Sequence, residues 1–320
     1  KSNDYYRKAN ERLKDYYIQQ AKNYQKIYKS FPALRSYQQA ETYIQDENEH
    51  ISILLEIISY AKSQKRYNIV EQYAKKLNNL YGERTYPLSW MGLVYLKIYV
   101  ADILGDTYIK QKQWGKAVDV YQNIIETVPA EHTYKEISAT QWAIKQIDYL
   151  IKEQGQKIYQ EYNRKAQKQH ENAKLTKNYF EYEQIAQKYP NYSNISEIYL
   201  EQAQILYSQD KFQECIDLIY SNNLDTLSQK EQFIAIIIEC FEKKQSWKQA
   251  KKYLFQLQKE SENSTEKING MSIVEWIQKK LSQKIYSTIP TIVIPQFHFQ
   301  RNARIRVPFY QKKYKNDHKV

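Results

Sequence analysis

The stretch that decides the fold is residues 101–129, which read ADILGDTYIKQKQWGKAVDVYQNIIETVP. A small residue stands in each half, Gly105 in the first and Ala117 in the second, where two helices can cross closely. Tyr121 follows Ala117 at helical spacing and suits the space around such a crossing. Pro129 ends the second half, because proline cannot continue a helix. The stretch therefore predicts two antiparallel helices joined by a short polar turn.

These residues resemble the tetratricopeptide-repeat family. The first helix carries L-G-x2-Y from Leu104, and the second carries A-x3-Y-x2-I followed by a terminating proline. Further copies align on the small residue of the second helix, and they lie at 51–81, 196–229 and 231–263, with half a copy at 162–190. The resemblance implies an all-α fold, a solenoid of stacked antiparallel helix pairs. An irregular helical bundle is the alternative.

The amino-acid composition favours a predominantly helical chain. The chain has 6 glycines in 320 residues, against a usual share of about 7%, and glycine supplies the tight turns of β-rich and nucleotide-binding folds. Its 2 cysteines cannot form a disulfide framework. The longest apolar stretch, Leu93 to Leu104, contains Lys97 and Asp102 and is too short for a bilayer. We therefore expect no membrane span.

Three regions are expected along the chain. Residues 1–50 form atypical or capping helices, 51–286 form the repeats, and 287–320 form a short extended, β-like and basic tail. Two long helices are expected at the start, over 4–29 and 36–64, with Pro32 between them. The tail is read as extended because three of the seven prolines and two β-branched runs fall within it.

The resemblance also implies a binding surface. In the family, the first helix of each repeat lines a concave groove that takes a peptide or a partner helix. Carried over by alignment, the groove residues are Tyr99, Asp102, Asp106, Lys110, Leu200, Gln204, Tyr207, Glu239 and Lys243. Asp102 and Asp106 stand where the chaperone-binding subclass has Lys and Asn, and they would repel a carboxylate. We expect aromatic and apolar contacts, rather than charge, to dominate binding.

The sequence contains no recognisable catalytic, phosphate-binding or metal-binding motif. The five histidines are far apart and lack metal-ligand spacing, and no Gly-rich phosphate loop or nucleophile motif occurs. Paired acids such as Glu47 and Glu49 are explained as solvated helix faces. The sequence therefore predicts a non-catalytic protein-interaction scaffold without cofactor or metal, within a larger assembly or at the front of a larger protein.

Two other functions stay open. The first is RNA binding, because the net charge is +12 and the tail is strongly basic. The basic tail residues are Arg301, Arg304, Arg306, Lys312, Lys313, Lys315 and Lys319. The second is a bacterial cell-envelope repeat module that precedes a macroglobulin-like β-domain, which Arg304–Val307 weakly resembles. The sequence gives no compartment.

Overall fold

The computed structural model describes residues 2–89, 91–222, 224–261 and 264–289. Its helices, in chain order, are α1 (Ser2–Lys26), α2 (Ser30–Glu41), α3 (Glu47–Ser63), α4 (Tyr67–Tyr81), α5 (Leu96–Lys110), α6 (Trp114–Thr127), α7 (Ala139–Gln154), α8 (Gln160–Thr176), α9 (Tyr179–Lys188), α10 (Ile195–Ser208), α11 (Phe212–Ser221), α12 (Lys230–Lys243), α13 (Trp247–Glu260), α14 (Ile273–Leu281) and α15 (Lys284–Thr288). Two 3₁₀ turns, η1 (Gln156–Tyr159) and η2 (Leu224–Thr226), interrupt the series. The fold is therefore all-α and built of helix pairs, as the sequence predicts.

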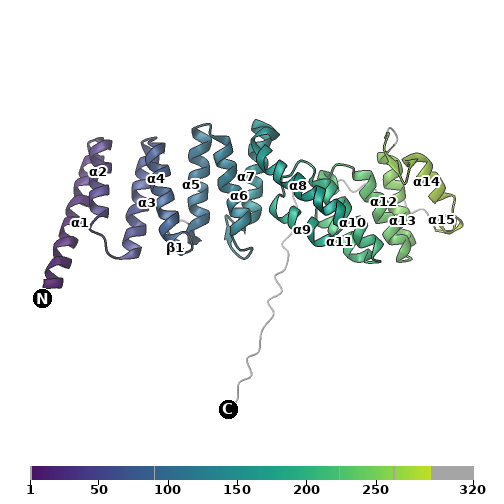
Figure 1. Ribbon diagram of the computed structural model, residues 1–320, viewed down its shortest axis with the longest axis horizontal. Coiled ribbons are helices and arrows are strands. Elements are labelled where there is room, and N and C mark those ends of the chain that lie inside the picture. Colours follow the sequence, from purple (N-terminus) through teal and green to yellow (C-terminus); the bar gives the residue numbers. More distant parts are fainter. Residues whose placement is uncertain (1, 90, 223, 262–263, 290–320) are drawn as a thin grey trace, which may run out of the picture.

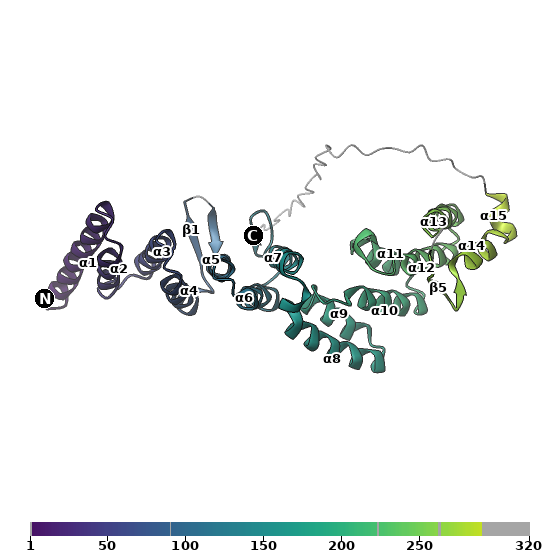
Figure 2. The same cartoon turned by 90° about the horizontal axis from the view of Figure 1, so that it is seen from above.

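The helices follow one another along the long axis of the molecule, with α1 and α15 at opposite ends (Figure 1). We call α1–α7 the N-terminal arm and α8–α15 the C-terminal arm. Seen from above, the helices of the N-terminal arm appear nearly end-on, whereas α8 and α10 are seen from the side (Figure 2). The direction of the helices therefore changes between α7 and α8.

Six helix pairs share one turn geometry. In each turn one non-glycine residue adopts a positive φ of 53° to 59°; these residues are Tyr28, Lys65, Lys112, Lys177, Asp210 and Gln245. Five residues later stands a fully buried side chain, which is Ala33, Val70, Ala117, Tyr182, Cys215 or Ala250. Five of the turns close with the same backbone bond, for example from the Gln113 N–H to the Tyr108 carbonyl at 2.8 Å. This is the Schellman end of a helix, which satisfies its last carbonyls.

Position 105 requires a glycine, because Tyr121 packs against its Cα and leaves no space for a side chain. A Cβ atom placed on Gly105 would lie 2.1 Å from the hydroxyl oxygen of Tyr121, whose ring is buried. No side chain fits at that distance without moving the tyrosine. The expectation that a small residue marks the crossing of α5 and α6 is confirmed, and Tyr121 is the group that imposes it.

In the part of the chain that the structure describes, three β-hairpins directly precede helices, and none of them was predicted from the sequence. They are β1 (Thr85–Leu88) with β2 (Gly92–Tyr95), β3 (Thr133–Tyr134) with β4 (Ile137–Ser138), and β5 (Lys267–Ile268) with β6 (Met271–Ser272). Both turn residues of the last two hairpins have positive φ, as a two-residue type I′ turn requires. The hairpins lead directly into α5, α7 and α14.

Buried polar side chains join the two arms. Tyr159 donates a hydrogen bond to Gln122 Oε1 at 2.8 Å, and Gln122 Nε2 donates to the Lys188 carbonyl at 2.6 Å. Asn191 Nδ2 donates to Asp148 Oδ1 at 2.6 Å. A hollow of about 600 Å³ opens beside this joint, between α6 and the pair α8 and α9. Because directional hydrogen bonds hold the joint, the change of helix direction is built into the fold.

The start of the chain differs from the sequence prediction. The helix expected over 36–64 is two helices, α2 and α3, and Asp46 begins the second by accepting the Glu49 N–H at 2.9 Å. Pro32 does not separate helices but lies in the first turn of α2. A proline is tolerated there because the first N–H groups of a helix have no partner within it.

Candidate functional site

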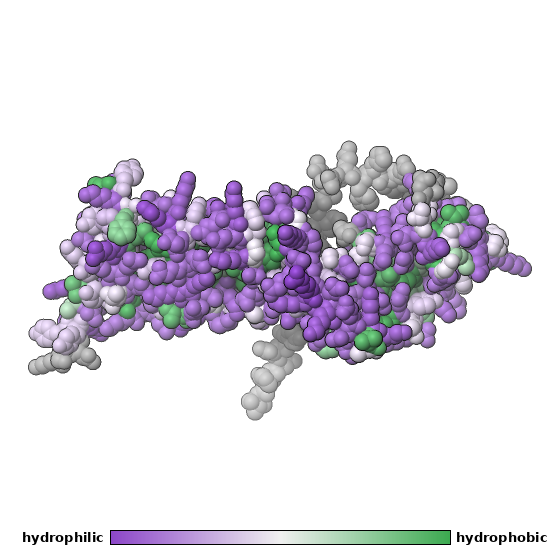
Figure 3. All heavy atoms as spheres, turned by 45° about the horizontal axis from the view of Figure 1, so that its top comes forward, coloured by the Kyte–Doolittle hydropathy of each residue, from purple (hydrophilic) through white to green (hydrophobic). Residues whose placement is uncertain are grey.

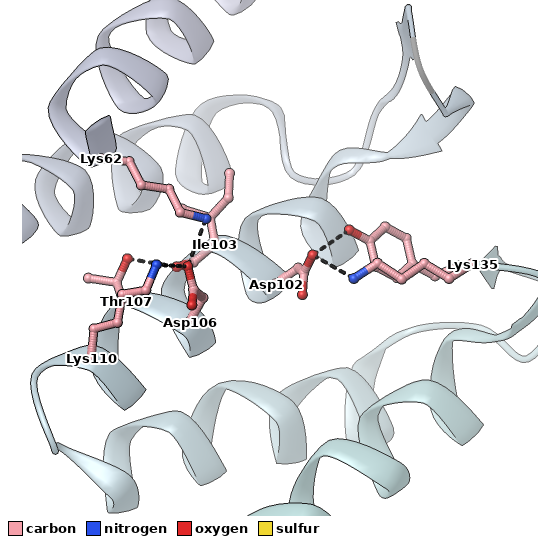
Figure 4. A network of polar contacts seen from close by, with 8 residues as sticks. Lys62, Asp102, Ile103, Asp106, Thr107, Lys110 and Lys135 are labelled. Carbon is pink, nitrogen blue, oxygen red and sulfur yellow. Dashed lines mark hydrogen bonds and ion pairs between the residues drawn. The ribbon is translucent and has the colours of Figure 1, made fainter. Parts of the chain in front are cut away.

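The candidate site lies on the face formed by the first helices of the pairs. In the N-terminal arm, Asp106 on α5 lies between Lys62 and Lys110 (Figure 4). Lys62 on α3 lies 2.7 Å from Asp106 Oδ2, and Lys110 lies 3.0 Å from the same oxygen. Burial raises the pKa of Asp106, but these two ammonium groups outweigh it and hold the pKa below its usual value. The carboxylate is therefore neutralised by the chain itself.

Asp102 is neutralised in the same way, one helical turn earlier. Tyr134 donates to Asp102 Oδ2 at 2.9 Å, and Lys135 Nζ lies 2.9 Å from that oxygen (Figure 4). Both partners come from the β3–β4 hairpin. Burial and the neighbouring carboxylate raise the pKa of Tyr134, so the phenol remains a donor. The hairpin thus closes this part of the N-terminal face with an ion pair.

The C-terminal arm has a hollow at the corresponding place. Its volume is about 130 Å³, and two helices and a hairpin line it. The lining residues are Leu200 and Gln204 on α10, Gln232, Ala235, Ile236 and Glu239 on α12, and Lys267, Ile268 and Asn269 on β5–β6. The hairpin wall is tied to α12, because Gln232 Nε2 donates to Glu266 Oε2 at 3.1 Å. We call this hollow the α10–α12 pocket.

Glu239 is the acid of the α10–α12 pocket. Among the residues that the structure describes, its carboxylate has no hydrogen-bond or ion-pair partner. Burial raises the pKa of Glu239 against the opposing charge of Lys280. Glu242, one turn on, differs: Lys280 pairs with it, and Tyr286 donates to its Oε1 at 2.5 Å. The half-buried Glu239 carboxylate thus feels the charges of Lys280 and Lys243 but forms no ion pair with either in the described residues.

The two arms can be compared position by position from their turns. Asp106 stands six residues before the left-handed residue Lys112, and Glu239 stands six residues before the left-handed Gln245. In the preceding pairs, Lys62 and Tyr207 each stand three residues before a left-handed residue, so these two positions also correspond. The C-terminal arm keeps the acid and a lysine four residues after it, Lys243, but replaces the other cation, Lys62, by a phenol. A phenol cannot balance a carboxylate charge.

The second ion pair of the N-terminal arm has also been replaced. Asp102 corresponds to Ala235, and the hairpin residue Lys135 corresponds to Asn269. Both replacements border the α10–α12 pocket. Where the first arm has a closed charge network, the second has a small residue, an amide and open volume.

The structure brings together part of the predicted groove. Leu200, Gln204 and Glu239 line one pocket, whereas Asp102, Asp106 and Lys110 belong to the network of the other arm. Tyr207 packs edge-on against Phe212 with ring centroids 5.6 Å apart, and burial raises its pKa to about 12. Two further groove residues, Tyr99 and Lys243, do not line the pocket. The seven basic tail residues, Arg301 to Lys319, lie outside the described residues.

The hairpin wall of the pocket was not predicted from the sequence. A signal for it exists, because residues 133–142 (TYKEISATQW) and 267–276 (KINGMSIVEW) share one pattern. Each has two turn residues, a serine that caps the following helix, and a tryptophan four residues later. The pair Asn269–Gly270 is in addition a strong hairpin signal. Aligning these two segments predicts both hairpins.

The repeated turn, the buried residue that follows it and the Gly105–Tyr121 crossing together decide the architecture. The chain is a tetratricopeptide-like α-solenoid. No family model and no curated protein matches its sequence. Solved tetratricopeptide structures do align with it over most of their length. The tetratricopeptide-like chain departs from a plain helical solenoid in its three hairpins.

Three solved structures give the extent of the likeness. The TPR2AB domain of yeast Sti1, in its pHSP90 complex, is 13% identical with a TM-score of 0.35, and the match covers 85% of this chain and 99% of that one. A tetratricopeptide repeat protein from Parabacteroides merdae is 12% identical with a TM-score of 0.32, and the match covers 84% of this chain and 98% of that one. PilF of Pseudomonas aeruginosa is 12% identical with a TM-score of 0.27, and the match covers 85% of this chain and 99% of that one. At such TM-scores the likeness extends to no site or partner.

No helix among the described residues is both long enough and apolar enough to cross a bilayer. No group of three or more His, Cys, Asp or Glu side chains within these residues is placed to hold a metal ion. The visible face of the molecule is mostly polar, with apolar residues gathered in small areas over both arms (Figure 3).

Proposed function

We propose that this chain is a non-catalytic interaction scaffold that receives a peptide or helix of a protein partner on its C-terminal arm. One observation carries the proposal: Glu239 has no partner among the described residues, although the equivalent Asp106 has two. A half-buried carboxylate is costly to leave without a partner. A partner that brings a cation into the pocket removes that cost, so the two surfaces complement each other.

The walls of the pocket suit a long basic side chain. Leu200, Ala235 and Ile236 provide apolar surface for a methylene stem, and Glu239 stands among them to meet the charged end. Charge at this position modifies the expectation that aromatic and apolar contacts dominate. In the proposed complex, apolar contacts position the stem and the carboxylate selects the cation.

The N-terminal arm then serves as a support. Its first-helix acids are already paired, so a basic side chain gains little by approaching them. Its core is continuous from Ala21 to Tyr159, which gives the C-terminal arm a firm attachment through the joint. A scaffold of this kind presents one selective pocket on an extended surface.

Peptide binding by the full chain tests the proposal. The probes are four short peptides with one central Arg, Lys, Gln or Glu in an otherwise identical neutral, apolar sequence. We expect the Arg and Lys peptides to bind the wild type, and Glu239→Gln to lose them. Asp106→Asn is the matched control and is expected to bind like the wild type. Equal binding of all four peptides, or equal binding by Glu239→Gln, would contradict the proposal.

A further inference from the structure

The α10–α12 pocket has the chemistry of an arginine site. Three amides, Gln204, Gln232 and Asn269, line the same pocket as the Glu239 carboxylate. A guanidinium offers five N–H groups in a plane, of which two bind a carboxylate side by side. The remaining N–H groups suit amide oxygens. An ammonium group is smaller and lacks this planar fork, so the pocket favours arginine over lysine.

The chain itself concentrates arginine in one short segment. It has nine arginines, and three of them, Arg301, Arg304 and Arg306, fall within six residues. Between Arg164 and Arg301 there is none, so every other cation of the C-terminal arm beyond α8 is lysine or histidine. The segment 301–307, RNARIRV, alternates arginine with small or apolar residues. Its arginines can meet the one acid of the pocket, Glu239, and its apolar residues can meet the apolar walls, while the one cation of the lining, Lys267, lies on the hairpin β5–β6.

The segment is also within reach. Residues 290–300 connect the end of the described chain to Arg301, and at about 3.3 Å per residue they span up to about 36 Å. The hairpin wall of the pocket and α15 both pack against α14. Neighbouring helices lie about 10 Å apart. Eleven residues therefore suffice to return from α15 to the pocket.

We propose that the segment 301–307 of this chain is the occupant of the α10–α12 pocket and places one of its arginines against Glu239. The inference rests on the proposed function, because it assigns an occupant to the same pocket. A tethered segment has an effective concentration on the order of millimolar. The tail then competes with a partner's basic side chain, and the partner must displace it to bind.

Photo-crosslinking in the full chain tests the occupant. The probe is p-benzoylphenylalanine in place of Gln204, an exposed residue at the rim of the pocket. We expect irradiation of the purified protein to link this position to residues 299–308, with a yield that does not change with protein concentration. The same probe in place of Lys110, on the N-terminal arm, is the matched control and is expected to give no such link.

Two variants test the guanidinium. Arg301→Lys, Arg304→Lys and Arg306→Lys together keep the charge, and we expect them to lower the crosslink yield several-fold; Glu239→Gln should lower it as well. The absence of a link to the tail, or an undiminished yield in the lysine variant, overturns the proposal. A yield that rises with concentration also overturns it and indicates the tail of a second copy. Circular dichroism of each variant confirms that it folds.

The four-peptide assay separates this inference from the proposed function. Changing the three arginines to glutamine empties the pocket on this account, so the Arg peptide should bind this variant more tightly than the wild type. Equal binding to both chains would leave the scaffold proposal standing and overturn the tail as occupant. Binding to neither would overturn both.

Discussion

The two arms carry the same acid at the same place and treat it differently. Asp106 is held by Lys62 and Lys110, whereas Glu239 has no ion-pair partner in the described part of the chain and lines a pocket. The cores differ as well: that of the N-terminal arm is one cluster, and the described buried residues of the C-terminal arm form three. A repeated architecture thus yields one arm with its charges satisfied and one arm open to a ligand.

The largest expected effect on peptide affinity comes from removing the carboxylate charge of Glu239. Glu239→Gln should weaken binding of the Arg peptide by about 10- to 100-fold, because a hydrogen bond to a charged group contributes about 1.5–3 kcal/mol. Isothermal titration calorimetry measures the change. Asp106→Asn in the other arm should alter the affinity by less than about twofold, since exposed ion pairs contribute little. Similar losses in both variants would show that the arms do not differ as described.

Filling the helix crossing of the N-terminal arm tests whether that arm acts only as a support. Gly105→Ala brings a methyl group against the Tyr121 hydroxyl, and overpacking of this kind costs about 1–3 kcal/mol. We expect a lower Tm by calorimetry but an unchanged affinity for the Arg peptide at 25 °C. Gly115→Ala is the control, because a Cβ there meets no neighbour within 4 Å. A lost affinity at unchanged folding would place binding in the N-terminal arm.

Restoring the missing cation should close the open arm. Tyr207→Lys places an ammonium group at the position that corresponds to Lys62, where it can pair with Glu239. We expect the affinity for the Arg peptide to fall by about 3- to 10-fold, because the peptide must displace this partner. Tyr207→Met keeps the apolar bulk without charge and is the control. An affinity that falls equally in both variants would assign the effect to lost packing of Tyr207 instead.

The smallest effect concerns stability and pH. The pKa of Glu239 is raised by burial, so the folded chain holds this proton more tightly than the unfolded chain. Stability is therefore lost as the pH rises from the unfolded pKa, about 4.3, through the folded pKa. In the chain with Arg301, Arg304 and Arg306 changed to glutamine, in which the pocket is empty, Glu239→Gln should raise Tm slightly at pH 7 and have no such advantage at pH 4. A lower Tm at pH 7 would mean that the glutamate is a structural residue with a partner.

Much of the fold was accessible from the sequence, for a physical reason. Helix pairs impose a short-range pattern, because the turn, the aromatic residue and the small residue all fall within one stretch such as Lys112 to Ala117. The split between α2 and α3 was harder, since the apolar periodicity runs across it and only Asp46 marks the second start. The hairpins β3–β4 and β5–β6 were missed because their two-residue strands leave almost no periodicity of their own.

The site could not be predicted to the same degree. Asp106 and Glu239 look alike in the sequence, because each is followed four residues later by a lysine. What distinguishes them is a residue of the preceding helix pair, Lys62 in one arm and Tyr207 in the other. That contact depends on how consecutive pairs stack. Only the three-dimensional arrangement shows which acid is neutralised and which remains available.

The most direct test of this account is a carboxyl NMR titration of the chain in which Arg301, Arg304 and Arg306 are changed to glutamine, so that its own tail leaves the pocket empty, read at Glu239 and Asp106 with and without the Arg peptide. The account predicts a raised pKa for Glu239 and a lowered one for Asp106. Adding the peptide should lower the pKa of Glu239 and leave that of Asp106 unchanged, because only the first carboxylate gains a cation. A Glu239 that titrates at or below its ordinary value, or a peptide that shifts Asp106 instead, would contradict the account.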